Sequence, residues 1–166
     1  MLILSSMTSL DSVDLELLAA LSREPRATVV ALADALGLSR NTVQARMARL
    51  DREGVFLSFE RAISTTALGY PIEAFINVLV RQVQLPQIAE DLSRIPEVVQ
   101  AHGMSGEVDL FVRVACRDTQ HLFETDARIL AIDGVERTET SLAMGEVIPY
   151  RIMPLLEMTR HRHSRR

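Results

Sequence analysis

The sequence lacks tryptophan and lysine and contains a single cysteine among its 166 residues. One cysteine cannot form a disulfide within the chain or supply a zinc site that needs several thiolates, so we expect a reducing, cytoplasmic environment. No apolar run approaches the roughly 20 residues that span a bilayer. The first residues also lack the basic start and long apolar core of a signal peptide. We therefore predict no membrane association.

Residues that carry chemistry are few and scattered. His102 and His121 are far apart in the sequence, and His161 and His163 lie among arginines that would repel a metal cation. The lone Cys116 has no evident base, and no glycine-rich phosphate loop occurs. We therefore predict no catalytic residue, no metal site and no cofactor, and hence a protein that is not an enzyme.

Charge is divided unevenly along a chain whose net charge is -4. Residues 1–64 carry 7 basic and 8 acidic side chains, residues 65–154 carry 7 and 13, and residues 155–166 carry 4 and 1. All 18 basic residues are arginine, as a GC-rich genome would produce, and arginine also binds phosphates and guanine through its planar fork. We expect the basic end to be a frayed tail that can touch DNA phosphates.

The first helical pattern begins at Asp11 or Ser12 and ends before Pro25. Asp14 falls in its first turn, where the helix dipole favours an anion. Apolar residues recur at helical spacing along this segment, namely Val13, Leu17, Leu18 and Leu21. This segment therefore predicts an amphipathic helix.

Two more helical patterns follow with almost no spacer. Thr28 caps the second, which ends at Gly37, and Ser39 begins the third. Two helices joined by so short a turn cannot lie parallel, and the helix-turn-helix motif uses such a turn. We therefore predict a helix-turn-helix in the first sixty residues.

The third helix has two different faces. Val43, Met47 and Leu50 share a narrow sector that must pack on the first two helices. The opposite sector alternates alanines with hydrogen-bonding side chains that can pair with bases and phosphates. An isolated helix with such a face is usually only solvated, but the compact three-helix setting favours DNA binding. The predicted DNA-contacting residues are Ser39, Arg40, Asn41, Thr42, Gln44, Arg46, Arg49 and Arg52.

After the third helix, Gly54 breaks the helical pattern. Residues 55–59, Val-Phe-Leu-Ser-Phe, then predict a short strand such as a winged domain places beside its recognition helix. The first domain is therefore predicted to be a winged helix-turn-helix.

From residue 69 onward the hydrophobic period changes to alternation. Residues 72–80 predict a strand that is apolar on both faces, so we expect a helix to cover one face and a partner the other. The remaining patterns predict a helix over 85–92, a hairpin of strands 98–104 and 109–116, a helix over 122–130 and a strand over 135–143. This order, βαββαβ, is that of a ferredoxin-like domain.

The predicted fold class is α+β, with an N-terminal winged helix-turn-helix followed by a ferredoxin-like βαββαβ domain. The expected division is a DNA-binding domain at 8–62, a linker at 63–71, an effector-binding and oligomerisation domain at 72–155 and a basic tail at 156–166.

The sequence resembles the Lrp/AsnC family of bacterial and archaeal transcription regulators over roughly residues 10 to 155. The matching segments occur in family order in both domains, and they are Leu10 to Asp14, Leu38 to Val43, Arg46 to Leu50, Gly54-Val55, Gly106 to Asp109 and Gly134 to Thr140. The resemblance implies a regulator of amino-acid metabolism that binds double-stranded DNA. It also implies homodimers that pair through their sheets and often assemble into octamers.

The resemblance further implies that a small effector, commonly an amino acid, binds against the loop between the second and third strands. An effector ammonium would suit Asp109 or Glu107, and its carboxylate would suit loop amides left accessible by glycines. Alternatively, Gly106 only forms the hairpin turn and Asp109 pairs locally. Glu107-Val108 replaces the aspartate and aromatic residue usual in the family. The predicted effector contacts are Gly103, Met104, Ser105, Gly106, Glu107, Asp109, Thr138 and Thr140.

Two other functions remain open at this point. Siroheme decarboxylases resemble the same family in both domains, and His102 lies near the effector loop. An effector-binding assembly protein that no longer binds DNA is a second alternative, although the polar face of the third helix argues against it. We favour a sequence-specific regulator whose paired recognition helices bind a pseudo-palindromic operator.

Overall fold

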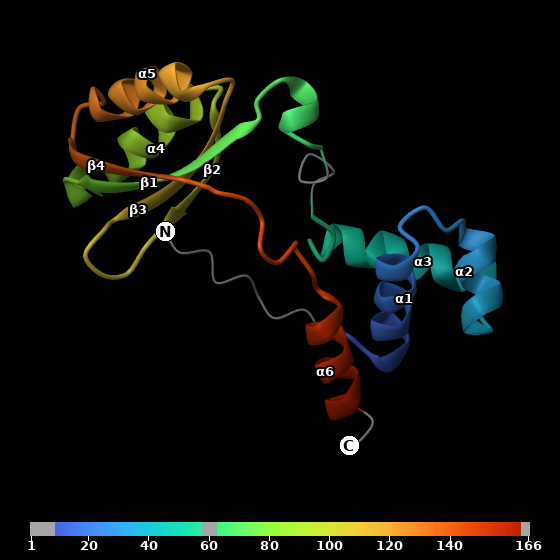
Figure 1. Ribbon diagram of the computed structural model, residues 1–166. Coiled ribbons are helices and arrows are strands. Elements are labelled where there is room, and N and C mark those ends of the chain that lie inside the picture. The colour runs from blue at the N-terminus through green and yellow to red at the C-terminus, as the bar shows by residue number, and fades with distance from the viewer. Residues whose placement is uncertain (1–8, 58–62, 164–166) are drawn as a thin grey trace. The chain divides into compact units, whose positions relative to one another are not determined.

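The computed structural model describes residues 9–57 and 63–163, and the chain divides into two compact units (Figure 1). One unit combines residues up to 61 with residues from 148 onward, and the other spans residues 62–147. Within the described ranges, no helix is long and apolar enough to cross a membrane.

The three predicted N-terminal helices are present as α1 (Ser12–Arg23), α2 (Val29–Leu36) and α3 (Arg40–Arg52). Asp11 caps α1 in a capping box with Asp14, so two backbone amides that would lack partners are satisfied. Gly37 ends α2 with a φ of 64°, a left-handed conformation that glycine adopts without steric cost. Its tight turn leads directly to α3, which confirms the predicted helix-turn-helix.

The core of this unit contains one cluster of apolar side chains from all three helices. Met47 and Val55 pack against this cluster while remaining partly exposed. The opposite face of α3 is left to solvent, as its polar pattern predicts. The buried members of the cluster are Leu17, Leu32, Ala33, Val43 and Leu50.

The segment after α3 forms no strand in its described part. Val55 and Leu57 lack regular structure and Phe56 lies in a bend. The last two residues of the predicted wing strand, Ser58 and Phe59, lie outside the described residues.

The prediction of a frayed basic tail at 156–166 is wrong for residues 156–163, which belong to helix α6 (Met153–His163). Helix α6 packs against α1 and buries Leu156. Its basic residues gather in the last turn, where the helix dipole favours cations. An apolar anchor and a favourable charge distribution therefore give this segment a reason to be helical.

The second unit is a four-stranded antiparallel sheet in the order β2-β3-β1-β4. Short 3-10 turns precede β1 at Thr66–Leu68 and α4 at Gln82–Gln84. The order of strands and helices is the predicted βαββαβ order. The elements are β1 (Ile72–Val80), α4 (Leu85–Ser93), β2 (Val98–Gly103), β3 (Leu110–Cys116), α5 (Thr119–Leu130) and β4 (Val135–Leu142).

Helices α4 and α5 cover one face of this sheet (Figure 1). Every second residue of β1 from Ala74 to Val80 points to the helices and is buried. On the other face, the ring of Phe75 stacks on that of Phe111 with centroids 5.1 Å apart, and Arg113 forms a bidentate ion pair with Glu73. This face, which we call the open sheet face, has no covering element among the described residues.

Candidate nucleic-acid interface and effector site

The outward surface of α3 is built from the side chains that the core does not use. Arg40, Asn41, Gln44 and Arg52 are exposed. None of these four side chains has a hydrogen-bond or ion-pair partner among the described residues. They can therefore donate to an external molecule without breaking an internal contact.

Two other predicted DNA contacts, Ser39 and Thr42, take part in the helix cap. The hydroxyl of Ser39 accepts a hydrogen bond from the backbone amide of Thr42 at 3.1 Å and lies 2.8 Å from the Thr42 hydroxyl. The cap holds the first turn of α3, whose free amides suit a phosphate. The side chains of Ser39 and Thr42 thus position the first turn of α3, which presents Asn41.

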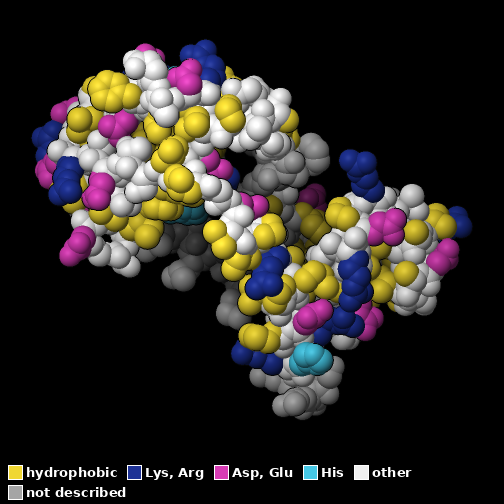
Figure 2. All heavy atoms as spheres, viewed as in Figure 1, with side chains coloured by type: hydrophobic (Ala, Val, Ile, Leu, Met, Phe, Trp, Pro, Cys, Tyr) yellow, Lys and Arg dark blue, Asp and Glu magenta, His cyan; other side chains and the backbone are white. Residues whose placement is uncertain are grey.

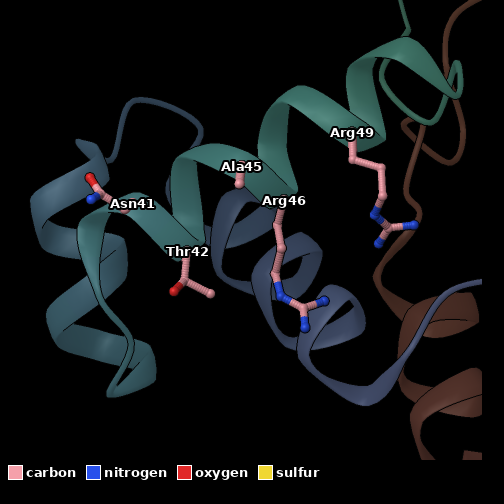
Figure 3. Close-up of a pocket in the computed structure, with 5 residues that line it drawn as sticks. All are labelled: Asn41, Thr42, Ala45, Arg46 and Arg49. Atoms are coloured by element: carbon pink, nitrogen blue, oxygen red, sulfur yellow. The ribbon is translucent and has the colours of Figure 1, made fainter.

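Arg46 and Arg49 turn from α3 toward α1. Figure 3 shows both around a shallow hollow that Asn41, Thr42 and Ala45 also line. Arg46 donates to Asp11 and to Asp14, each at 2.7 Å, and Arg49 donates to Asp14 at 2.5 Å.

The Asp14 side chain is only 1% exposed, so a buried carboxylate ties α3 to α1 through two partly exposed arginines. Arg49 is also paired with Glu53 one turn along α3. Both arginines therefore have partners inside the domain.

Electrostatics within this cluster favours the charged forms. Burial by itself would raise the pKa of Asp14, but hydrogen bonds from Arg49, the Asp11 amide and Arg46 outweigh it and lower the pKa. The hydrogen bond to Asp11 raises the pKa of Arg46, and the one to Asp14 raises that of Arg49. The positive charge of both arginines is balanced locally, which leaves Arg40 and Arg52 as the unpaired cations of this face among the described residues.

The second candidate site is the loop that joins β2 and β3. The amide of Met104 donates to the carbonyl of Asp109 at 2.8 Å and closes the hairpin, and Gly106 has a φ of 131°. The residues from Gly103, the last of β2, to Glu107 are exposed. Their backbone and the Glu107 carboxylate are accessible to a small molecule.

The two carboxylates predicted to bind an effector differ. Asp109 is half-buried, and it accepts a hydrogen bond from the Val80 amide at 2.8 Å and another from the Gln82 side chain. Glu107 is exposed and has no partner among the described residues. Asp109 thus pairs locally, which was the alternative expectation, while Glu107 remains available.

Thr138 and Thr140 lie opposite Val78 and Ile76 of β1, so they face the helices. Both hydroxyls donate to the carboxylate of Asp126 on α5, at 3.2 Å and 2.7 Å. Their side chains therefore fasten α5 to the sheet rather than stand free beside the loop.

Sequence reasoning missed the partners of these side chains. The sequence indicates Asp14 only as a residue favoured by the helix dipole, and no pattern in it points to Asp126 or Gln82. The contacts that Asp14 makes with Arg46 and Arg49 span more than thirty residues, so no local spacing could signal them.

Family models match both units. A model described as the AsnC-type helix-turn-helix domain matches residues 10–51, and one described as the Lrp/AsnC ligand binding domain matches residues 73–153. The chain belongs to the Lrp/AsnC family. It is a DNA-binding transcriptional regulator that carries a ligand-binding domain.

Members of this family resemble most of the chain, across both units. An HTH-type transcriptional regulator of Pyrococcus abyssi is 34% identical over 139 residues, covering 83% of this chain and 88% of its own. The regulatory protein AsnC of Escherichia coli K12 is 27% identical over 149 residues, covering 87% of this chain and 97% of its own. The solved structure of E. coli AsnC superposes with a TM-score of 0.79 at 26% identity, covering 89% of this chain and 100% of its own.

A further solved structure is the leucine response regulatory protein of Mycobacterium tuberculosis. It has a TM-score of 0.76 at 27% identity and covers 86% of this chain and 98% of its own. These family relatives are named as regulators, which does not favour the siroheme decarboxylase alternative. His102, on which that alternative depended, is an exposed residue of β2.

Proposed function

We propose that this regulator binds a pseudo-palindromic operator as a homodimer, with residues 8–62 contacting DNA and residues 72–155 binding an amino acid. The observation that carries the proposal is the exposed face of α3, where Asn41, Gln44, Arg40 and Arg52 have no internal partner among the described residues. Asparagine and glutamine suit adenine, and arginine suits guanine, in the major groove. Two such helices related by a twofold axis would enter successive grooves about one helical turn apart.

Within this interface the arginines of α3 take different roles. Arg40 and Arg52 contact bases or phosphates directly. Arg46 and Arg49, which the sequence also placed at the DNA, hold α3 at a fixed angle to α1 through Asp14. Arg46 and Arg49 therefore contribute to DNA affinity mainly by holding α3 in the orientation that binds DNA.

The proposed effector site is the β2–β3 loop. Glu107 supplies the carboxylate for the effector ammonium, because Asp109 is occupied by Val80 and Gln82. Amides of the exposed loop around Gly106 bind the effector carboxylate. An amino acid is supported by the name of the leucine response relative and by the ligand-binding family model.

The proposed dimer pairs two open sheet faces. Phe75, Leu79 and Phe111 are half-buried apolar residues there, and a second copy would remove them from water. Association of dimers into octamers would place effector loops between dimers, so an effector would change how dimers associate. We propose that the protein acts in the cytoplasm, without catalytic activity.

The proposal is tested by measuring binding of the purified protein to genomic fragments, its own promoter region included. Binding is followed over a salt series, with and without a pool of amino acids. We expect tight, salt-sensitive binding to a few fragments and a change when one amino acid is present. Equal binding to every fragment at every salt concentration would refute sequence-specific regulation.

Two substitutions then test the base contacts on a selected fragment. Asn41→Ala and Gln44→Ala should each weaken specific binding by about 1 to 3 kcal/mol and spare binding to random DNA. Fluorescence anisotropy with both duplexes measures the two affinities. Ala48→Gly, which lies on the same face without a polar group, controls for changes in the helix itself. Equal losses on both duplexes would contradict the assignment.

A further inference from the structure

Helix α6 extends beyond both family domains. The family models match residues 10–51 and 73–153, whereas α6 runs from Met153 to His163. Neither the helix-turn-helix nor the ligand-binding domain therefore accounts for it. Its function has to be inferred from what it contacts and from the charges it carries.

Helix α6 docks on the DNA-binding unit through α1. Leu15 and Ala19 of α1 are 1% exposed but lie outside the three-helix core cluster. Glu16, on the same side of α1, forms an ion pair with Arg160 of α6 at 3.9 Å. Leu156 of α6 is buried as well. These observations place α6 over the side of α1 that the core does not use.

This docking changes the charge of the DNA-binding unit. Residues 1–61 contain 7 arginines and 8 acidic residues, a net charge of -1. Residues 148–166, which belong to the same unit, contain 5 arginines and 1 acidic residue, a net charge of +4. The unit as a whole therefore carries +3, whereas residues 62–147, with 6 arginines and 13 acidic residues, carry -7. Without the C-terminal segment, the DNA-binding unit would be slightly acidic.

We propose that the basic end of α6 is an accessory phosphate-binding surface that the DNA-binding unit holds against the DNA backbone. This inference rests on the proposed DNA-binding function and extends it to residues outside the helix-turn-helix. The last turn of α6 is basic, and Arg162 there is exposed without a partner among the described residues. Figure 2 shows arginine side chains, in dark blue, on the surface of the unit that contains α1, α3 and α6.

The charge of α3 explains why such a surface is needed. Asp14 and Asp11 balance Arg46 and Arg49, so few cations of the recognition helix are free for phosphates. Phosphate contacts supply most non-specific affinity for DNA, and each one adds about 0.9 to the salt dependence of binding. A basic helix carried rigidly by the same unit supplies the missing contacts.

The basic turn has a simpler explanation, in which its charges only complement the helix dipole of α6. The two explanations differ in what Arg162 does to DNA binding. If the Arg162 charge only stabilises α6, its removal leaves the salt dependence of DNA binding unchanged. If Arg162 contacts a phosphate, its removal lowers that salt dependence.

The test measures binding of the full chain to a random-sequence duplex over a salt series by fluorescence anisotropy. We expect Arg162→Gln to lower the slope of log Kobs against log salt by about 0.9 for each bound protomer. Arg117→Gln, which removes one exposed charge from the other unit, is the matched control and should leave the slope unchanged. Circular dichroism checks that both variants keep the helix content of the wild type.

A second variant tests the docking. Leu156→Ala keeps every charge but removes the buried anchor of α6, and we expect it to lower DNA affinity together with the slope. Provided that the wild type binds DNA, an unchanged salt slope in Arg162→Gln would overturn the inference. A slope change in Arg117→Gln equal to that in Arg162→Gln would overturn it as well. Full binding by Leu156→Ala would overturn the rigid docking. A wild type that binds no DNA would instead refute the proposed function itself.

Discussion

The ion pairs of the buried Asp14 carboxylate lead to a strong prediction for Asp14→Asn. The carboxylate accepts hydrogen bonds from Arg46 at 2.7 Å, Arg49 at 2.5 Å and the amide of Asp11 at 2.9 Å. Asparagine has one acceptor oxygen and turns an amide group toward a guanidinium. The substitution therefore removes the negative charge that balances the positive charges of Arg46 and Arg49.

The expected cost follows from the exposure of the partners. Removing one partner from a buried ion pair costs about 3 to 5 kcal/mol. The arginine side chains are 25% and 31% exposed, so water compensates part of their loss, and we expect about 2 to 3 kcal/mol for the DNA-binding unit. That range corresponds to a roughly 30- to 140-fold change in the opening equilibrium.

Hydrogen-exchange mass spectrometry measures this change locally, from peptides that cover α1 and α3. Asp34→Asn is the matched control, because Asp34 is an exposed residue of α2 whose side chain has no partner among the described residues. Exchange in peptides from the sheet unit should not change. A cost for Asp14→Asn below about 1 kcal/mol, or equal to that of Asp34→Asn, would refute a stabilising role for the cluster.

The pH dependence has a definite sign. The pKa of Asp14 lies below its ordinary value of 3.8 in the folded protein, because its hydrogen bonds outweigh burial. Its contribution to stability is therefore complete above that ordinary value and is lost as the pH falls through the lowered pKa. The stability difference between wild type and Asp14→Asn should accordingly be constant near neutral pH and shrink in acid.

Two further predictions concern the turn and the proposed dimer. Gly37→Ala should destabilise the DNA-binding unit by about 1 to 2 kcal/mol in urea unfolding, because a left-handed φ of 64° disfavours a β-carbon. No neighbouring atom would clash with that carbon, so Gly37→Asn, which tolerates this conformation, should lose less, and equal losses would contradict the explanation. Phe75→Glu should convert the dimer to monomers in analytical ultracentrifugation, while Phe123→Glu, on the exposed side of α5, should remain dimeric. A dimeric Phe75→Glu variant would refute pairing through the open sheet face.

The sequence predicts this fold well where the deciding interactions are local. Gly37 and Ser39 fix the turn through backbone conformation and capping, which involve neighbouring residues only. The strand and helix periods of the second unit likewise follow from alternation along each segment. These features could be predicted because one segment at a time determines them.

The functional surfaces were predicted less completely, because distant residues decide which side chains are free. Helical spacing places Arg46 and Arg49 near the outward face of α3, but Asp14 draws them inward. Alternation places Thr138 and Thr140 on one face of β4, but only the pairing with β1 shows that this face meets α5.

The docking of α6 has a consequence for how the protein is made. The three-helix core is complete in sequence before residue 58, yet α1 also packs against helix α6, which residues 153–163 form. During synthesis, α1 therefore leaves the ribosome without this packing partner until residues 153–163 have been translated. A fragment cut after residue 61 to isolate the helix-turn-helix would lack this packing partner and should associate with other copies.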